Sequence, residues 1–336
     1  MRTARIKVQA EQGEAVYHCT SKTVNGERLF DDTGKEILRR QLWLVAEFCG
    51  VQILTYAILS NHFHVLVRVP QKAAVADAEL LRRYTLLHPK PTRYQTARLE
   101  VIQAALAADP AADPEAAAQA NAWRRRQLAL VGDVSAFMKL VKQRFAIWYN
   151  KSHQRFGPLW CDRFKSVLVE SKPRLLETMA AYIDLNPVRA GLVTDPKDYR
   201  FCGYAEAVAG HRPARVGLQA IHGGDWASTQ AGYRQTLFGT AAGPREQGAV
   251  ITPADFAKVV KAGGQLPLST VLRCRIRYFS DGAVLGCRAF VEQHLRAYRT
   301  RQHCRERTAP RPLLTITDWA GEDLATLRGL RQHPFG

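Results

Sequence analysis

The sequence lacks the cysteine patterns that hold small secreted domains or zinc sites together. Its seven cysteines are scattered and odd in number, and no two of them form a C-x-x-C pair. We therefore expect neither a disulfide framework nor a zinc site built from cysteine. Unpaired thiols of this kind fit a reducing cytoplasm.

Long apolar runs are also missing. The longest apolar stretch, residues 42–59, is interrupted by Glu47 and Gly50, so it predicts a helix leading into a strand rather than a membrane span. Residues 1–15 are polar and charged, without the apolar core that a signal peptide needs. We therefore expect a cytoplasmic protein with no membrane partner.

Acidic residues are scarce relative to basic ones. The 336 residues include 30 Asp+Glu against 48 Lys+Arg, which gives a formal net charge of +18. Such a surplus favours a polyanionic partner, because each phosphate neutralised by Lys or Arg releases bound counterions. Nucleic acid is therefore the expected partner, and a basic but otherwise ordinary enzyme is the alternative.

The pattern of apolar residues predicts an α+β fold in the first part of the chain. Alternation indicates strands at residues 15–24, 51–59, 62–69 and 164–170, and helical spacing indicates helices at about 35–48, 135–150 and 173–186. This order is that of a ferredoxin-like antiparallel sheet flanked by helices.

Composition divides the chain into three parts. Residues 1–210 are expected to form a catalytic domain, and an Ala-rich and Arg-rich helical insertion at about 71–131 has no role that the sequence assigns. Residues 211–250 are Gly-rich and are expected to be a linker, followed by a helical accessory region at 251–336.

The accessory region is strongly basic. Residues 271–312 contain ten Arg against three acidic residues, so the net charge is 10 − 3 = +7. Helical stretches at 268–279 and 287–298 are separated by a turn at 280–282, as in a helix-turn-helix that binds DNA. A helical hairpin packed on the catalytic domain is the alternative.

Two histidines, His62 and His64, stand in the predicted strand N-H-F-H-V-L-V. Side chains two apart on a strand point to the same face, so the two imidazoles lie side by side while Phe63, Val65 and Val67 face the core. Two neutral imidazoles fit a divalent metal ion. An exposed or hydrogen-bonded pair without a metal is the alternative.

Tyr182 and Asn186 are four residues apart in a predicted helix, so they share one face of it. Pro187 then ends or kinks the helix. This spacing lets a phenol and an amide oxygen approach one metal centre together. The alternative is a core tyrosine followed by an asparagine that caps the helix.

Four segments of the chain form a joint pattern. They are N-H-F-H-V-L-V at 61–67, F-M-K-x-x-K-Q-R-F at 137–145, R-F-K-S-V-L-V-E at 163–170 and Y-I-D-L-N-P-V-R-A-G-L-V at 182–193. Together they resemble the REP-associated tyrosine transposases, which belong to the HUH-type single-tyrosine transposase superfamily. The resemblance covers about residues 15–210.

The resemblance implies a metal-dependent endonuclease and strand transferase that acts on single-stranded DNA at palindromic or hairpin repeats, in a bacterial cytoplasm and associated with the nucleoid. It implies that His62, His64 and Asn186 bind Mg²⁺ or Mn²⁺ and that Tyr182 is the nucleophile. Attack would leave a 5′-phosphotyrosine and a free 3′-OH, so rejoining needs no ATP. Some relatives exchange the tyrosine helix between subunits, and a monomer and a homodimer both remain open.

Basic and aromatic side chains around these segments are candidates for contact with DNA. The basic candidates are Lys22, Arg28, Lys139, Lys142, Arg144, Arg155, Arg163, Lys165, Arg189, Arg275 and Arg277. The candidates for stacking on bases are Trp148, Tyr149, Phe156 and Trp160. Two alternatives to the transferase stay open: a non-catalytic nucleic-acid-binding regulator on the same fold, and a hydrolase in which water attacks and Tyr182 is structural.

Overall fold

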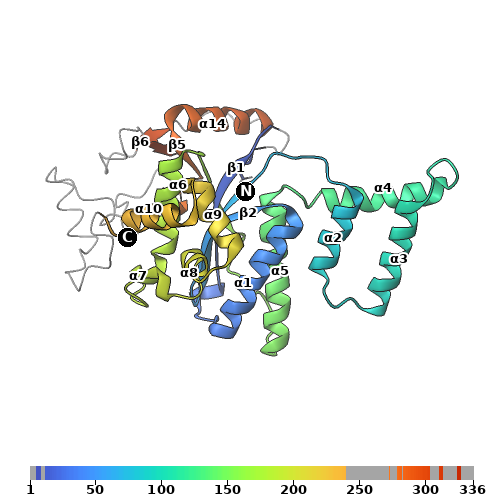
Figure 1. Cartoon of the computed structure of the whole chain (residues 1–336), viewed down its shortest axis with the longest axis horizontal. Coiled ribbons are helices and arrows are strands. Elements are labelled where there is room, and N and C mark those ends of the chain that lie inside the picture. Colours follow the sequence, from blue (N-terminus) through green and yellow to red (C-terminus); the bar gives the residue numbers. More distant parts are fainter. Residues whose placement is uncertain are drawn as a thin grey trace.

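A seven-stranded sheet forms the centre of the protein, with strand order β2-β3-β1-β4-β5-β7-β6 (Figure 1). The computed structural model describes residues 5–8, 12–239, 272, 278–281, 283–302, 310–312 and 324–326. The strands are β1 (Ala15–Lys22), β2 (Gln52–Ile58), β3 (His62–Val69), β4 (Lys165–Val169), β5 (Val284–Cys287), β6 (Arg311–Pro312) and β7 (Leu324–Thr326).

Helices cover both faces of this sheet. In chain order they are α1 (Asp32–Cys49), α2 (Asp77–Leu87), α3 (Arg93–Ala107), α4 (Pro114–Leu128), α5 (Val134–Ser152), α6 (Pro173–Asp184), α7 (Asn186–Arg189), α8 (Gly203–Val208), α9 (Arg212–His222), α10 (Trp226–Phe238), α13 (Tyr278–Asp281) and α14 (Arg288–Gln302). Short 3₁₀ turns lie at Val24–Gly26 and Pro196–Asp198.

The first four strands form the expected ferredoxin-like unit. β3 lies between β1 and β2, β4 lies on the other side of β1, and all three pairings are antiparallel. Helix α1 joins β1 to β2, and α5 precedes β4. The predicted α+β class, an antiparallel sheet flanked by helices, is therefore confirmed.

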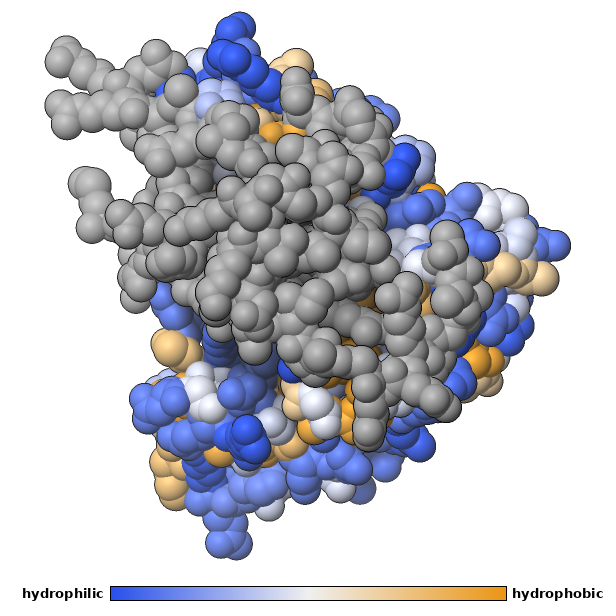
Figure 2. Space-filling model, turned by 90° about the vertical axis from the view of Figure 1, so that its left-hand side faces the viewer, coloured by the Kyte–Doolittle hydropathy of each residue, from blue (hydrophilic) through white to orange (hydrophobic). Residues whose placement is uncertain are grey.

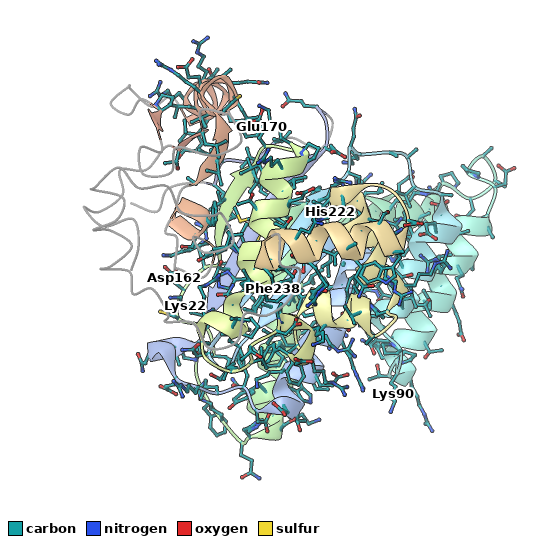
Figure 3. The ribbon with its side chains drawn as sticks, turned by 60° about the vertical axis from the view of Figure 1, so that its left-hand side comes forward. Lys22, Lys90, Asp162, Glu170, His222 and Phe238 are labelled. Atoms are coloured by element: carbon teal, nitrogen blue, oxygen red, sulfur yellow. The ribbon has the colours of Figure 1, made fainter. Side chains whose placement is uncertain are left out.

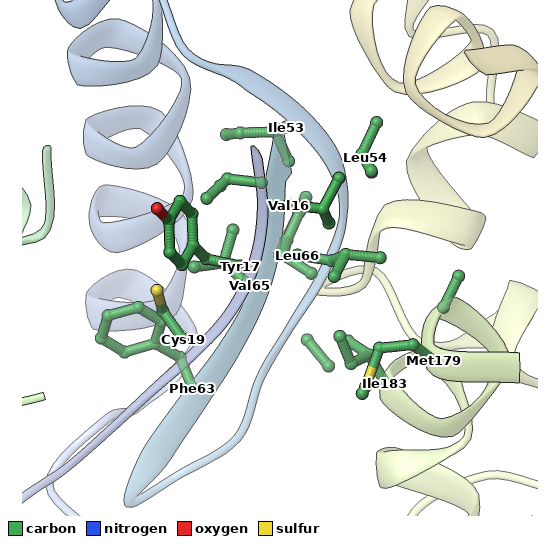
Figure 4. Close-up of a cluster of buried hydrophobic side chains, with 14 of the residues drawn as sticks. Val16, Tyr17, Cys19, Ile53, Leu54, Phe63, Val65, Leu66, Met179 and Ile183 are labelled. Carbon is green, nitrogen blue, oxygen red and sulfur yellow. The ribbon is translucent and has the colours of Figure 1, made fainter. Parts of the chain in front are cut away.

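Both faces of the sheet are buried, which explains why β3 reads as a nearly continuous apolar run. Figure 4 shows Tyr17 and Phe63 pointing toward one layer of helix, while Leu66 points toward Met179 of α6 on the other side. Helices α1 and α5 pack on each other, and α6 and α9 pack against β2. Phe63, Val65 and Val67 are fully buried, as the alternation predicts.

Local signals set the ends of the helices that carry the site. The Asp31 side chain accepts a hydrogen bond from the Gly34 amide (2.7 Å) at the start of α1, and Gly50, with φ 63°, ends it. Helix α5 is capped by Asp133, whose side chain accepts from the Ala136 amide (2.7 Å). Helix α6 ends at Asp184, and Pro187 lies in the separate short helix α7.

The insertion forms an arm of three helices, α2 to α4, that extends away from the sheet (Figure 1). Its small core consists of Leu80, Ile102 and Trp123. An ion pair between Arg82 and Glu47 (2.7 Å) ties α2 to α1. The arm therefore has its own packing and is attached at its base.

The expected linker is wrong for the residues that the structure describes, because 212–238 form α9 and α10. Gly217 of α9 lies so close to β2 that a Cβ atom there would stand 2.4 Å from the Ile53 carbonyl oxygen. Helix α9 thus covers the free edge of the sheet, which would otherwise expose unpaired backbone groups. The unit built on the central sheet therefore extends beyond residue 210.

The expected helix-turn-helix is also wrong, since strand β5 lies between α13 and α14. β5 runs parallel to β4, with Leu168 opposite Val284 and Val169 opposite Leu285. The described C-terminal strands β5, β6 and β7 therefore extend the central sheet. Most of the first expected helix, 268–279, lies outside the described residues. Within them, no helix is long and apolar enough to cross a membrane.

Candidate active site

His62 and His64 lie side by side on β3, as their spacing predicts. Their ring centroids are 5.2 Å apart and the rings are nearly perpendicular, at 79°. His64 is buried, whereas His62 is half-buried near the end of the strand. Because Lys22 is paired with His62 and Thr20 with His64, these two residues of β1 share the histidine face.

A third histidine, His18 of β1, completes a buried cluster. Its ring stacks on that of His64, with centroids 5.0 Å apart and an angle of 19°. Its Nε2 lies 2.8 Å from His64 Nδ1, and its Nδ1 lies 2.5 Å from the carbonyl oxygen of Phe279 in α13. Sequence reasoning missed His18, because only the register of β1 against β3 brings it to His64.

These contacts determine which nitrogens carry protons. A carbonyl oxygen only accepts, so His18 Nδ1 donates to Phe279 and the neutral ring accepts at Nε2. His64 Nδ1 must then donate to His18, which leaves the lone pair of His64 on Nε2. Burial lowers the pKa of His18 to about 4 and the pKa of His64 well below its ordinary value, so both rings are neutral.

His62 has the same tautomer for a different reason. Its Nδ1 lies 2.6 Å from the side-chain oxygen of Asn61, whose amide nitrogen donates to the Gly26 carbonyl (2.9 Å). Since the nitrogen of that amide points to Gly26, its oxygen faces His62 and accepts from Nδ1. In the neutral form of His62 the lone pair is therefore also on Nε2.

Two imidazoles prepared in this way fit a divalent metal ion. Ligating histidines usually donate their other N–H to a neighbouring acceptor, which fixes the ring and its tautomer. With metal–nitrogen bonds of about 2.1 Å, two rings on one ion have centres roughly 4.5–6 Å apart, and the observed separation is 5.2 Å. Among the described residues, no group of three or more His, Cys, Asp or Glu is arranged to hold a metal. A third protein ligand from the described residues would therefore be of another type.

Asn186 serves in the structure as the cap of α6. Its side-chain amide donates to the carbonyl oxygens of Ile183 (3.0 Å) and Tyr182 (3.3 Å). This is the alternative that its spacing left open. The amide nitrogen is engaged, so the side-chain oxygen is the atom that a metal would use.

Tyr182 lies in the same chain as the histidines and on their face of the sheet. Its ring centroid is 6.3 Å from that of His18 and 6.3 Å from that of His64. The ring is only 2% exposed and meets Phe279 edge to face, at 4.9 Å. Its hydroxyl makes no hydrogen bond to any residue that the structure describes. The tyrosine is thus beside the histidines but covered.

Arg189 supports Tyr182 instead of facing solvent. Its guanidinium lies 4.2 Å from the centre of the Tyr182 ring and donates to the Tyr182 and Leu272 carbonyls, each at 2.7 Å. Such contacts fix both the ring and the end of α6. Arg189, which was predicted to contact DNA, is therefore placed to stabilise the Tyr182 ring and the end of α6.

Asp184 anchors the helix that carries Tyr182, and sequence reasoning gave it no role. It is fully buried and accepts hydrogen bonds from Thr55 of β2 (2.9 Å), Tyr233 of α10 (2.5 Å) and the Tyr204 amide (3.2 Å). Burial raises the pKa of this carboxyl to about 7. The network holds α6 against the sheet, and so holds Tyr182 beside the histidines.

The predicted basic residues differ in exposure. Five of them are exposed: Lys22, Arg28, Lys139, Arg163 and Lys165. Three are less exposed and make hydrogen bonds: Lys142 to the Asp162 carbonyl (2.6 Å), Arg144 to Gln41 (2.8 Å), and Arg155 to the Pro158 carbonyl (3.2 Å). Arg275 and Arg277 lie outside the described residues.

Lys22 and Lys165 belong to the histidine face. Lys22 is opposite His62 and Lys165 is opposite Thr20 in the sheet. Figure 3 shows Lys22 at the same end of the molecule as Asp162, and the Cys161 amide donates to the Lys22 carbonyl (3.0 Å). On the face shown in Figure 2, the described surface is mostly hydrophilic with small apolar areas.

Only one of the predicted stacking residues is available to a ligand. Phe156 is 94% exposed. Tyr149 is buried, and Trp148 and Trp160 pack around Phe145. The aromatic residues of α5 therefore belong to the core.

No family model and no curated protein matches the chain. Among solved structures, it is similar to that of a REP-associated tyrosine transposase bound to a REP hairpin. The identity is 15% and the TM-score is 0.39, and the match covers 67% of this chain and 93% of the other. At this level of identity the similarity is one of structure.

Proposed function

We propose that this protein is a metal-dependent, single-tyrosine DNA endonuclease and strand transferase that acts on single-stranded or hairpin DNA. The observation that carries the proposal is the position of Tyr182, whose ring lies 6.3 Å from that of His64 on one face of one sheet. A phenol beside two imidazoles is the arrangement that such chemistry needs.

In the proposed reaction Tyr182 is the nucleophile. The hydroxyl oxygen of Tyr182 attacks the scissile phosphorus and forms the phosphotyrosine bond, and the bond from phosphorus to O3′ breaks. The phenolic proton is lost and the departing O3′ is protonated. In the reverse step a 3′-OH attacks the same phosphorus and releases Tyr182. A divalent cation, Mg²⁺ or Mn²⁺, held by His62, His64 and the Asn186 oxygen would polarise the phosphate and offset its charge.

The positions of the surrounding residues support this assignment. Lys22 and Lys165, on the histidine face, are placed to hold the phosphates that flank the scissile one. Phe279 packs edge to face on the Tyr182 ring, and we propose that the DNA displaces it on binding. Arg189 and Asp184 keep the tyrosine helix in place meanwhile.

The burial of Tyr182, at 2% exposure, favours one other candidate, a regulator that binds DNA without cutting it. The test uses end-labelled single strands with a hairpin and random flanks, incubated with Mn²⁺ or Mg²⁺ and run on a denaturing SDS gel. We expect a covalent adduct that Tyr182→Phe abolishes. Tyr149→Phe is the matched control, since Tyr149 is also buried but donates to the Leu29 carbonyl away from the cluster.

Two results would replace the proposal. Cleavage that persists in Tyr182→Phe would make water the nucleophile and the protein a hydrolase. Binding with no adduct and no cleavage, under either metal, would make it a regulator.

A further inference from the structure

The insertion arm contains a small cavity that the proposed chemistry does not use. It lies where α2, α3 and α4 meet, has a volume of about 220 Å³, and is lined by Tyr84, Arg98, Trp123, Arg126 and Gln127 together with two aliphatic side chains. Pockets for drug-sized molecules measure roughly 300–1,000 Å³. The space therefore suits a single ring system.

Two aromatic rings form walls of this cavity. Trp123 is only 4% exposed, and its ring centroid lies 6.1 Å from that of Tyr84, at an angle of 69°. Tyr84 is half-buried and has the His88 ring on its other side, at 4.5 Å. Rings held in this way keep their position when a flat ligand enters, and a base stacked on an aromatic side chain gains about 1–3 kcal/mol.

Gln127 supplies a polar group in an otherwise enclosed place. It is 9% exposed, and its side-chain amide makes no hydrogen bond to any residue that the structure describes. Because Gln127 lines the cavity, its amide can bond a ligand that enters there. An amide offers a donor and an acceptor next to each other, which matches the edge of a nucleobase.

Arg98 and Arg126 bring positive charge to the rim. Both are exposed, and neither forms an ion pair or hydrogen bond with a described residue. Their neighbours differ: Arg83 pairs with Glu79 (2.7 Å) and Arg124 pairs with Asp77. No described residue that lines the cavity is a carboxylate. The rim is therefore suited to an anion such as a phosphate.

We propose that the arm binds one unpaired nucleotide of the DNA strand on which the protein acts. The base enters the cavity and packs against the Tyr84 and Trp123 rings, Gln127 hydrogen-bonds its edge, and Arg98 and Arg126 hold the adjoining phosphates. This inference rests on the proposed function for the choice of single-stranded DNA as the ligand. The arm then binds the DNA strand at a second position, away from the cleaved phosphate.

Two pairs of variants with the same loss of charge test the site. Arg98→Ala/Arg126→Ala removes the rim of the cavity. Arg93→Ala/Arg125→Ala removes two exposed arginines from the same helices, α3 and α4, outside the cavity. Full-length protein carrying Tyr182→Phe is used throughout, so that binding is measured without cleavage.

The readout is fluorescence anisotropy of a labelled hairpin with a single-stranded flank, at fixed salt. We expect the first pair to weaken binding at least tenfold and the second less than threefold. Gln127→Met, which keeps the volume, should abolish any preference among flanks that differ in one base. Circular dichroism checks that each variant is folded.

The outcomes separate this inference from the proposed function. Equal weakening by the two pairs, or none, overturns the arm site even if wild-type protein forms the Tyr182 adduct. Selective weakening by Arg98→Ala/Arg126→Ala supports the site even if no adduct forms. Selective weakening seen equally with a blunt duplex that has no unpaired base would also overturn it, because stacking in the cavity needs a base that is free.

Discussion

The hydrogen bonds of His18 make a sharp prediction about metal binding. Replacing His18 by Phe keeps a flat ring against His64 but removes the nitrogen that accepts from His64 Nδ1. One partner remains, since Thr20 Oγ1 lies 3.1 Å from the same nitrogen. Loss of a group that orients a ligating histidine typically costs about 10–100-fold in metal affinity.

Because Thr20 Oγ1 remains beside His64 Nδ1, the loss of metal affinity should lie at the lower end of that range. We expect His18→Phe to weaken Mn²⁺ binding about tenfold, and His18→Phe/Thr20→Val about 100-fold. Binding is measured without DNA by titration calorimetry and by the loss of the free Mn²⁺ signal in electron paramagnetic resonance. His88→Phe, in the arm and away from the cluster, is the control.

Unchanged Mn²⁺ affinity in the double variant would refute this role for His18. A direct check is nitrogen NMR spectroscopy of the imidazole rings in the metal-free protein. It should show His64 protonated on Nδ1, and a proton on Nε2 would contradict the deduced chain of hydrogen bonds.

Three further predictions concern the surroundings of the site. Tyr233→Phe removes one of the donors to the buried Asp184 carboxyl and should lower the free energy of unfolding by about 1–3 kcal/mol. This is measured in urea titrations, and an unchanged midpoint would count against the network. Lys22→Ala should weaken binding of single-stranded DNA and reduce the slope of log K against log[salt] by about 0.7, whereas an unchanged slope would mean that Lys22 contacts no phosphate. Phe279→Ala should speed formation of the Tyr182 adduct while lowering stability by about 3–5 kcal/mol, and a slower reaction in folded protein would show that the ring helps catalysis.

Local patterns were enough to predict the centre of the fold. The alternation in β3 gives its bounds and the side on which each residue lies, because both depend only on neighbours in the chain. The helix predicted to carry both Tyr182 and Asn186 is wrong in its length, because α6 ends at Asp184 and Asn186 lies in the separate helix α7. What such patterns could not supply was register. His18 reaches His64 only because β1 and β3 pair with Thr20 opposite His64, a contact across 44 positions of the chain.

The prediction for the C-terminal part of the chain was wrong for a related reason. β5 has four residues and makes its bonds to β4, more than a hundred positions earlier, so no repeat within it distinguishes a strand from a helix. The prediction missed helix α9 because the Gly-rich composition of residues 211–250 suggested a linker. Gly217, the one glycine within α9, is the residue that allows the helix to approach β2.

Phe279 links the two halves of the site through different parts of one residue. Its carbonyl accepts from His18 and so sets the tautomer of His64, while its ring covers Tyr182. The two roles can be separated, because Phe279→Ala removes the ring but keeps the carbonyl. If DNA displaces the whole residue, the histidine chain loses its acceptor as the tyrosine is uncovered. Phe279→Ala without DNA should then leave Mn²⁺ affinity unchanged, whereas a loss as large as that of His18→Phe would mean that the ring, and not only the carbonyl, holds the chain in place.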